Sequence, residues 1–225
     1  MSTQADRFKD VRVVGFDLDQ TLYPKSPDID TMIQKYLYEK IAEHRGIALI
    51  DAELLFKELY RDGSGLSGRQ TLESLGLSEA SNLVQEALER ADIAAVLRPD
   101  QTVNRFLAEL RVSCDGMDLI TGSNLSQTQK KLAALGLSPE SFTHCLTEDQ
   151  ASKSDGAAYR LWLSLYPHLP PRHFLYIGDR VQSDHVVPAA LGIRTALVNV
   201  RAVDAQISVP QLPSLLDLRG LLPAR

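Results

Sequence analysis

The sequence predicts an α/β fold, in which a parallel sheet carries a helical domain inserted after its first strand. Short apolar runs rich in β-branched residues recur along the chain, as they do in buried strands. Amphipathic segments with three- and four-residue spacing separate the later runs, and each can cover one face of a parallel sheet. A chain of 225 residues is long enough for one such core and one insertion.

The strands of the core are expected at five apolar runs. The first run ends just before Asp17, and the later ones alternate with helical patterns. The tail from Val209 contains several prolines and predicts irregular chain around one short helix. We expect strands over residues 11–16, 117–121, 143–147, 173–177 and 195–200.

The segment between the first two strands shows helical patterns and hardly any strand character, and no crossover needs its length. We expect helices over residues 28–44, 51–61, 68–75 and 79–96, with Asp51 as the N-cap of the second. Proline disfavours helix in the residue before it, so the junctions are expected near Tyr23-Pro24 and Arg98-Pro99. The expected domains are a core of residues 1–23 and 99–225 and a helical domain of residues 24–98.

The composition excludes several classes of protein. A formal net charge of −5 offers no basic face to a nucleic acid polymer. The polar N-terminus lacks the apolar region of a secretory signal, and no apolar stretch approaches the roughly 18 residues of a membrane span. We therefore expect a cytoplasmic protein, a monomer or weak dimer, that binds neither membranes nor nucleic acid polymers.

Two carboxylates, Asp17 and Asp19, directly follow the first expected strand. This would place Asp17 at the sheet edge where open α/β folds bind ligands. Carboxylates this close resist ionising together unless a cation lies between them, and oxygen ligands favour a hard cation such as Mg²⁺. Capping a helix would explain one aspartate, but not the pair followed by Thr21.

Two further groups of polar residues follow later strands. Thr121 would end the second strand and Gly122 would turn into the next helix, where a hydroxyl and free backbone N–H groups form an anion site. Gly178 would permit a tight turn after the fourth strand, and Asp179 would present an oxygen to the cation. Asp184 follows five residues later, at an expected helix start.

The run Asp17-Leu18-Asp19-Gln20-Thr21 resembles the first motif, Asp-x-Asp-x-Thr, of the haloacid dehalogenase-like (HAD) superfamily of phosphotransferases. The superfamily pattern continues with a Thr or Ser, a Lys and a Gly-Asp-x-x-x-x-Asp motif, which Thr121, Lys153 and residues 178–184 match in order. Ser154-Asp155-Gly156 is a mild departure from the residues that usually follow the lysine. The resemblance implies a Rossmann-like parallel core with an inserted helical cap domain.

The resemblance also implies a phosphoryl transfer mechanism. Asp17 would attack phosphorus to form an aspartyl-phosphate. Asp19 would give a proton to the leaving oxygen and later take one from water. The expected ligands of Mg²⁺ are Asp17, Asp19 through its backbone carbonyl, Asp179 and Asp184, and the expected phosphate contacts are Thr121, Gly122 and Lys153.

Within the superfamily, the chain looks like the pyrimidine 5′-nucleotidase subgroup. The similarity lies in the run from Asp17 to Pro24, the Gly-rich segment 62–69 and residues 97–100. It implies a small phosphorylated metabolite as substrate, a nucleoside 5′-monophosphate that is hydrolysed to nucleoside and phosphate. Tyr60, Arg69 and Asn124 are the candidate substrate contacts.

Several alternatives remain open at this stage. A phosphatase or mutase for another small metabolite, such as phosphoglycolate or a sugar phosphate, uses the same core. A receiver domain of a signalling relay also gathers acidic residues, Thr and Lys around a phosphorylated Asp, although receivers are much shorter. A catalytically silent binding protein is the weakest alternative, because every catalytic position is filled.

Overall fold

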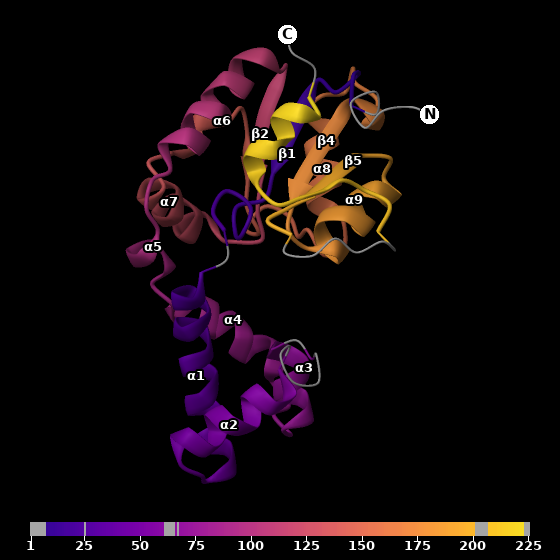
Figure 1. Ribbon diagram of the computed structural model, residues 1–225. Coiled ribbons are helices and arrows are strands. Elements are labelled where there is room, and N and C mark those ends of the chain that lie inside the picture. The colour runs from indigo at the N-terminus through magenta and orange to yellow at the C-terminus, as the bar shows by residue number, and fades with distance from the viewer. Residues whose placement is uncertain (1–7, 25, 61–65, 67, 201–206, 223–225) are drawn as a thin grey trace. The chain divides into compact units, whose positions relative to one another are not determined.

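The computed structural model describes residues 8–24, 26–60, 66, 68–200 and 207–222. The chain divides into two compact units, one made of Met1–Pro24 with Leu97–Arg225 and the other of Lys25–Val96. The first unit contains the sheet, and the described part of the second contains the helices α1 to α5 (Figure 1).

The sheet of the first unit has six strands in the order β3-β2-β1-β4-β5-β6, and every pairing is parallel. The first strand therefore lies inside the sheet, between β2 and β4 (Figure 1). This arrangement confirms the predicted α/β class. The strands are β1 (Val13–Phe16), β2 (Gly116–Ile120), β3 (Cys145–Leu146), β4 (Phe174–Gly178), β5 (Arg194–Val198) and β6 (Gln211–Leu212).

The strand predictions were incomplete at the C-terminal end. A strand lies at each of the five expected runs, but β6 falls in the tail that was expected to be irregular. Its two residues lie between Pro210 and Pro213. Proline has no N–H to donate to a ladder, so this segment fits only at an edge of the sheet, where a short strand gives little sequence signal. The expected short helix is the 3₁₀ helix Leu215–Gly220.

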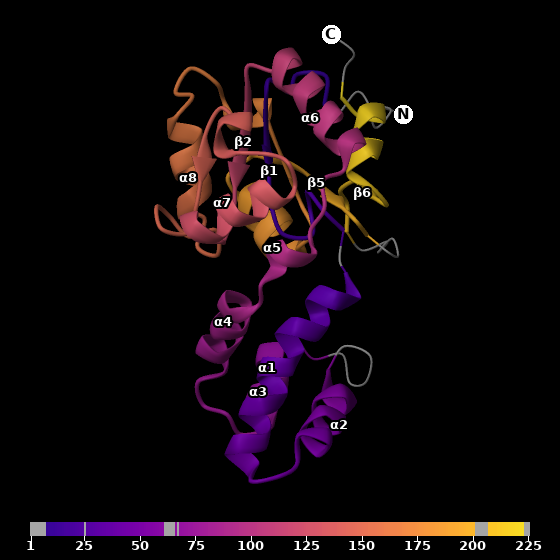
Figure 2. The ribbon, with the colours of Figure 1, turned by 90° about the vertical axis from the view of Figure 1, so that its left-hand side faces the viewer.

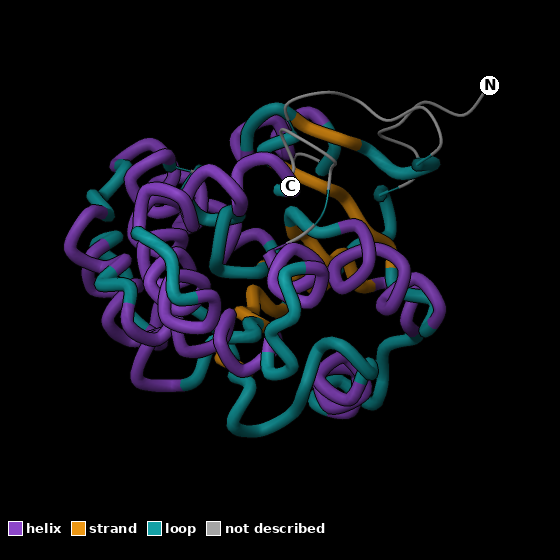
Figure 3. The backbone as a smooth tube through the Cα atoms, turned by 90° about the horizontal axis from the view of Figure 1, so that it is seen from below, coloured by secondary structure: helices purple, strands orange, loops and turns teal. Residues whose placement is uncertain are grey.

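Helices and loops connect the strands of this unit, and Figure 3 colours helices purple, strands orange and loops teal. Asp100 caps the first of these helices, because its carboxylate accepts hydrogen bonds from the backbone N–H groups of Thr102 and Val103 at 2.8 and 3.2 Å. The helices are α6 (Gln101–Ser113), α7 (Leu125–Ala134), α8 (Ala157–Ser164) and α9 (Val187–Ala190), with a π-helical turn over Val181–Val186.

One face of the sheet packs against α8 through aromatic residues. Trp162 and Tyr159 of this helix are fully buried, and the Trp162 ring lies edge-on to Phe174 of β4. A Cβ atom on Gly15 of β1 would lie 2.7 Å from the Trp162 ring. Glycine at this position is therefore required for the close approach of α8 to the strand that leads to Asp17.

The second unit is a small helical domain with its own core (Figure 2). Its longest helix, α1, packs against both α2 and α4. Ser26 caps the start of α1, and Gly46 ends it in a left-handed conformation, with φ 64°. The helices are α1 (Pro27–Arg45), α2 (Leu49–Leu59), α3 (Gly68–Ser74), α4 (Ala80–Arg90) and α5 (Ile93–Val96), and residues of the core include Leu37, Ile41, Phe56, Leu72 and Ala87.

Two predictions for this unit were wrong in detail. The helix expected over residues 79–96 is interrupted at Ala91, which is extended, so that α4 and α5 are separate. Asp51 is not an N-cap, because α2 begins two residues earlier and Ala48 precedes it. Asp51 instead lies in the first turn, where its negative charge is favourable to the helix dipole.

The Gly-rich segment 62–69 falls largely outside the described residues. Among the helices that the structure describes, none combines the length and the apolar character that a membrane crossing demands.

Candidate active site

Asp17 and Asp179 meet at the carboxyl edge of the sheet because they follow neighbouring parallel strands. Phe16 of β1 is in register with Ile177 of β4, and the backbone N–H of Asp17 donates to the carbonyl of Ile177 at 2.8 Å. Asp184 approaches the same point from the π-helical turn. One carboxylate oxygen from each of Asp17, Asp179 and Asp184 lies within 4.8 Å of the other two. We call these three residues the carboxylate cluster.

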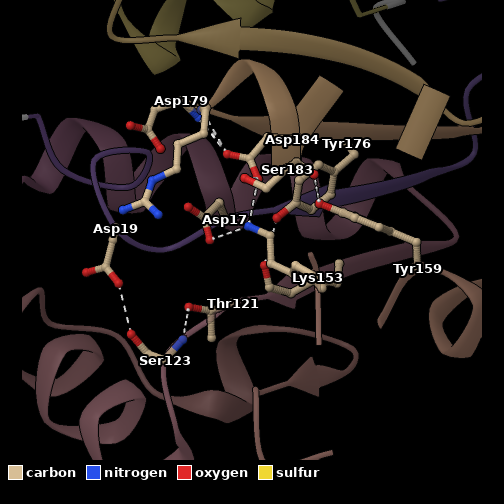
Figure 4. Close-up of polar contacts among 12 residues, drawn as sticks. Asp17, Asp19, Thr121, Ser123, Lys153, Tyr159, Tyr176, Asp179, Ser183 and Asp184 are labelled. Carbon is tan, nitrogen blue, oxygen red and sulfur yellow. Dashed lines mark hydrogen bonds and ion pairs between the residues drawn. The ribbon is translucent and has the colours of Figure 1, made fainter. Parts of the chain in front are cut away.

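Lys153 neutralises part of this cluster. Its ammonium group lies 2.8 Å from Asp17 Oδ1 and 2.7 Å from Asp184 Oδ1, and Figure 4 shows it between the two carboxylates. Lys153, Asp17 and Asp184 are all buried, and a buried lysine requires such partners. Lys153 lies in the connection before α8, where the order of motifs along the chain predicted it, and its side chain reaches Asp17 and Asp184.

Asp184 is held rigidly, whereas Asp179 has an oxygen to spare. Asp184 Oδ2 accepts hydrogen bonds from the backbone N–H groups of Asp179 and Arg180, at 3.1 and 2.9 Å, and Oδ1 accepts from the Ser183 hydroxyl at 3.0 Å. Asp179 Oδ1 is buried without a hydrogen-bond partner among the described residues. An orphaned oxygen beside two further carboxylates fits the oxygen-only ligand set of a hard divalent cation.

The close approach of Asp184 depends on Gly178. A Cβ atom on Gly178 would lie 2.4 Å from the Asp184 side chain. The backbone of Gly178 does not have a positive φ angle, so this position does not need the left-handed freedom of glycine. The physical requirement is space for the carboxylate, not backbone freedom.

Burial makes the cluster unfavourable for negative charge. Desolvation, partly offset by Lys153 and reinforced by Asp184 and Asp19, raises the pKa of Asp17 to about 6. Desolvation and the nearby charge of Asp17 raise the pKa of Asp179 to about 7. For Lys153, burial lowers the pKa, but the charges of Asp17 and Asp184 outweigh it, and the pKa is raised. A divalent cation would stabilise the ionised carboxylates, which burial and their mutual repulsion disfavour.

Asp19 lies apart from the carboxylate cluster and has its own cation. Lys131 Nζ lies 2.7 and 2.9 Å from its two carboxylate oxygens, and the Ser123 hydroxyl donates to Asp19 Oδ2 at 2.9 Å (Figure 4). Tyr23 donates its hydroxyl to Asp19 Oδ1. Burial alone would raise the pKa of Asp19, but Lys131 and these hydrogen bonds lower it.

Thr121 and Gly122 lie at the end of β2, as expected, but the start of α7 is partly occupied by protein groups. Thr121 is buried, and its hydroxyl oxygen accepts from the backbone N–H of Ser123 at 3.1 Å. Asn124 accepts from the N–H of Gln127 at 2.9 Å, and Asp149 accepts from the N–H of Leu125 at 2.6 Å. The expected free N–H groups of this helix start therefore do not include these two.

Gly122 borders open space, since a Cβ atom on it would meet no atom within 4 Å. Asn124 serves as the N-cap of α7. The other two candidate substrate contacts, Tyr60 and Arg69, have partners within the helical unit. The Tyr60 ring stacks on Phe56 at 5.0 Å, and Arg69 forms an exposed ion pair with Glu73 at 3.0 Å.

The family model for hydrolases of the haloacid dehalogenase-like type matches residues 11–190, which is more than half of the chain. The chain belongs to the HAD-like hydrolases. The matched region contains all the residues of the carboxylate cluster, Lys153 and Asp19.

Solved structures show the same fold. A HAD-like family hydrolase of Streptococcus pneumoniae is 16% identical to this HAD-like hydrolase, with a TM-score of 0.66, and the match covers 94% of this chain and 98% of that one. A magnesium-bound protein described as HAD-hydrolase YfnB, from Bacillus subtilis, is 18% identical, with a TM-score of 0.58 and coverage of 95% and 99%. A HAD phosphatase of Thermococcus onnurineus is 19% identical, with a TM-score of 0.58 and coverage of 93% and 97%.

Sequence reasoning about this HAD-like hydrolase missed Lys131, Ser123 and Asn199. Asn199 follows β5, and its side-chain amide donates to the backbone carbonyls of Gln20 and Thr21 at 2.7 and 3.3 Å. Lys131 could have been found, because it falls among the buried positions Thr128 and Leu132 of α7 and Leu135, which follows the helix. A lysine at such a position requires a buried anion.

Proposed function

We propose that this HAD-like hydrolase is a Mg²⁺-dependent phosphatase that cleaves phosphomonoesters through an aspartyl-phosphate on Asp17. The observation that carries the proposal is the division of the four aspartates. Three form a cluster at the sheet edge with Lys153, and the fourth, Asp19, is held separately two residues after Asp17. A nucleophilic carboxylate and a separate proton-transfer carboxylate are the two groups that ester hydrolysis through a phosphorylated aspartate needs.

In the proposed first step, a carboxylate oxygen of Asp17 forms a bond to phosphorus while the ester P–O bond breaks. The Asp19 carboxyl gives its proton to the leaving oxygen. In the second step, Asp19 takes a proton from water, the water oxygen attacks phosphorus, and the bond between phosphorus and Asp17 breaks. Lys153 would neutralise the transferred oxygens, and Thr121 and Gly122 would contact them from the end of β2.

Mg²⁺ fits the carboxylate cluster, since Asp17, Asp179 and Asp184 offer oxygen ligands and one Asp179 oxygen is otherwise unpartnered. Asp19 would add its backbone carbonyl. When bound, the ion would offset the repulsion between the anionic nucleophile and an anionic phosphate.

For the substrate, we infer a pyrimidine nucleoside 5′-monophosphate. The support is the resemblance of the segments around Asp17–Pro24 and residues 97–100 to the pyrimidine 5′-nucleotidases. The Gly-rich segment that completes this resemblance lies mostly outside the described residues. Membership of a hydrolase family favours an enzyme over a receiver domain or a silent binding protein.

The test is a phosphate-release screen with Mg²⁺ against nucleotides, sugar phosphates and phosphoglycolate. We expect UMP and CMP to be among the best substrates, and EDTA to abolish release. The Asp17→Asn variant should fold normally but lose turnover by at least about 10³-fold, because the amide is not a nucleophile. If unrelated esters exceed UMP and CMP, the nucleotidase assignment is wrong while the phosphatase assignment stands. If Asp17→Asn retains turnover, the mechanism itself is wrong.

A further inference from the structure

Lys131 is a buried lysine outside the carboxylate cluster. It lies on α7, and only 5% of its surface is exposed. The next residue toward the N-terminus, Lys130, is on the same helix and is exposed. Placing an ammonium group inside a protein costs several kcal/mol of free energy unless an anion compensates its charge. The burial of Lys131 therefore requires an explanation, whereas the burial of an apolar residue would not.

The explanation is Asp19, which lies 112 residues away in sequence. Lys131 Nζ contacts both carboxylate oxygens of Asp19 and also lies 3.0 Å from the Ser123 hydroxyl oxygen. The Ser123 hydroxyl in turn donates to Asp19 Oδ2. Asp19, Ser123 and Lys131 therefore form a closed triangle of contacts, and with the Tyr23 hydroxyl on Oδ1 they determine the orientation of the carboxylate.

The triangle keeps Asp19 away from the carboxylate cluster. Asp17 is only two residues away, yet its carboxylate pairs with Lys153, while Asp19 pairs with Lys131. Without a cation of its own, Asp19 would be drawn toward Lys153 or toward a divalent cation bound at the cluster. A carboxylate that ligates a divalent metal ion is no longer available to exchange a proton with a substrate, whereas an ammonium group that hydrogen-bonds to it leaves it within reach of one.

We propose that Lys131 is a positioning residue of this hydrolase, which, with Ser123, holds the Asp19 carboxyl apart from the carboxylate cluster and oriented for proton transfer to the leaving oxygen. The inference rests on the proposed phosphatase function. The step that it serves is the first one, in which the bond from Asp17 to phosphorus forms, the ester P–O bond breaks and the proton of Asp19 passes to the departing oxygen.

The step can be tested with two esters that differ in their need for that proton. A p-nitrophenolate ion leaves readily without protonation, whereas the alkoxide of an alkyl phosphate such as β-glycerophosphate or UMP does not. The parameter kcat/KM reports the steps up to the first irreversible one, the phosphorylation of Asp17, for each ester. Misplacement of Asp19 should therefore lower kcat/KM for the alkyl ester far more than for p-nitrophenyl phosphate.

For Lys131→Met, we expect kcat/KM to fall on both esters, and the fall on the alkyl ester to be at least about tenfold larger than the fall on p-nitrophenyl phosphate. A difference of this size lies within the range that general acid catalysis contributes. Lys131→Arg should recover part of the loss, because it restores a cation. The matched control is Lys130→Met, which removes an exposed lysine from the same helix and should leave both values unchanged. Circular dichroism and a Mg²⁺ binding isotherm on each variant check that the fold and the cluster are intact.

If Lys131→Met does not fold, Ser123→Ala carries the test, because it removes the two contacts that the Ser123 hydroxyl makes and leaves Asp19 paired with Lys131. It should show the same preference for the nitrophenyl ester, with a smaller loss of about threefold. Equal losses on the two esters, in a wild-type enzyme that cleaves both, would overturn this inference and leave the phosphatase function standing. A wild-type protein that cleaves no ester would overturn the proposed function, and this inference with it.

Discussion

The aspartates of the site differ in what surrounds them, and this difference assigns their chemistry. Asp17 and Asp179 have raised pKa values because they are buried near other carboxylates. Asp19 has a lowered pKa despite its burial, because Lys131, Tyr23 and Ser123 donate to it. Identical side chains two residues apart thus differ in their acidity, because burial and neighbouring carboxylates outweigh Lys153 at Asp17, whereas Lys131 and the hydrogen bonds outweigh burial at Asp19.

The raised pKa values of Asp17 and Asp179 predict how pH and Mg²⁺ together affect the thermal stability of the protein. Because the folded protein holds protons on Asp17 and Asp179 more tightly than the unfolded chain, these groups favour folding most at low pH. Their contribution to the free energy of unfolding of the metal-free protein falls as the pH rises from about 4 through about 7. In the proposed site Mg²⁺ would bind the ionised carboxylates, so the increase in Tm that it produces should grow over the same interval.

Thermal melting with and without Mg²⁺, from about pH 5 to about pH 8, measures this effect. The Asp179→Asn variant should show a much weaker dependence of the Mg²⁺ effect on pH, because one of the titrating groups is gone. A Mg²⁺-induced rise in Tm that is constant across this range would contradict the prediction.

Gly178 is predicted to be a position where one added methyl group disrupts the carboxylate cluster and with it the proposed Mg²⁺ binding. In Gly178→Ala the new Cβ would meet Asp184, which is held by Lys153 and two backbone N–H groups and cannot move without breaking them. We expect weaker Mg²⁺ binding by isothermal titration and a loss of stability of about 1–3 kcal/mol.

Gly220→Ala is the matched control, because its Cβ would meet no atom within 4 Å. If Gly178→Ala binds Mg²⁺ as tightly as this control does, the steric requirement inferred for Gly178 is wrong.

At the level of the elements, the segment after β1 is held by the segment after β5. Gln20 and Asn199 both have a left-handed backbone with φ 57°, and the Asn199 amide donates to the carbonyls of Gln20 and Thr21. The contact joins residues 179 positions apart and fixes the backbone immediately after Asp19. Asparagine suits this position because it tolerates the left-handed region and supplies the donor.

The two roles of Asn199 can be separated by substitution. Asn199→Gly keeps the backbone conformation but removes both hydrogen bonds, whereas Asn199→Ala also adds the strain of a left-handed residue with a Cβ. We expect both to lower kcat, and Asn199→Ala to be less stable than Asn199→Gly by about 1 kcal/mol. Urea unfolding measures the difference, and equal stabilities would show that the left-handed conformation is not retained in the alanine variant.

The helix α7 combines several functions in ten residues. Asn124 and Asp149 bond N–H groups at its start, Thr128 and Leu132 are buried along its inner face, and Lys131 projects from that face to Asp19. Amphipathic spacing predicted the helix, because burial of one face follows from the 3.6-residue period. Lys131 is the charged residue among these buried positions, and it needs Asp19 as its partner there.

For the molecule as a whole, the parallel sheet explains why the site could be anticipated from the order of residues. Carboxyl ends of neighbouring parallel strands meet at one edge, so residues that follow β1, β2 and β4 converge although they are far apart in the chain. Asp17, Thr121 and Asp179 are such residues. Lys153 was predicted differently, from its place in the order of motifs that the superfamily shares.

Other features depended on contacts that no local pattern contains. The short strand β6 lies between prolines and forms because β5 offers an unpaired edge. The break between α4 and α5 lies in a continuous helical pattern. The need for Gly178 to be a glycine comes from the side chain of Asp184, which lies in space where a Cβ would be.

The sequence by itself determined the class of fold, the presence of a helical insertion and the residues at the carboxyl edge of the sheet, because the hydrophobic period and the order of motifs along the chain require no knowledge of tertiary contacts. Only the tertiary structure decided which lysine pairs with which aspartate: Lys153 pairs with Asp17 and Asp184, and Lys131 pairs with Asp19. The physical reason is that the charge of a buried group is set by what lies within a few ångströms of it, and packing brings those groups together from distant parts of the chain.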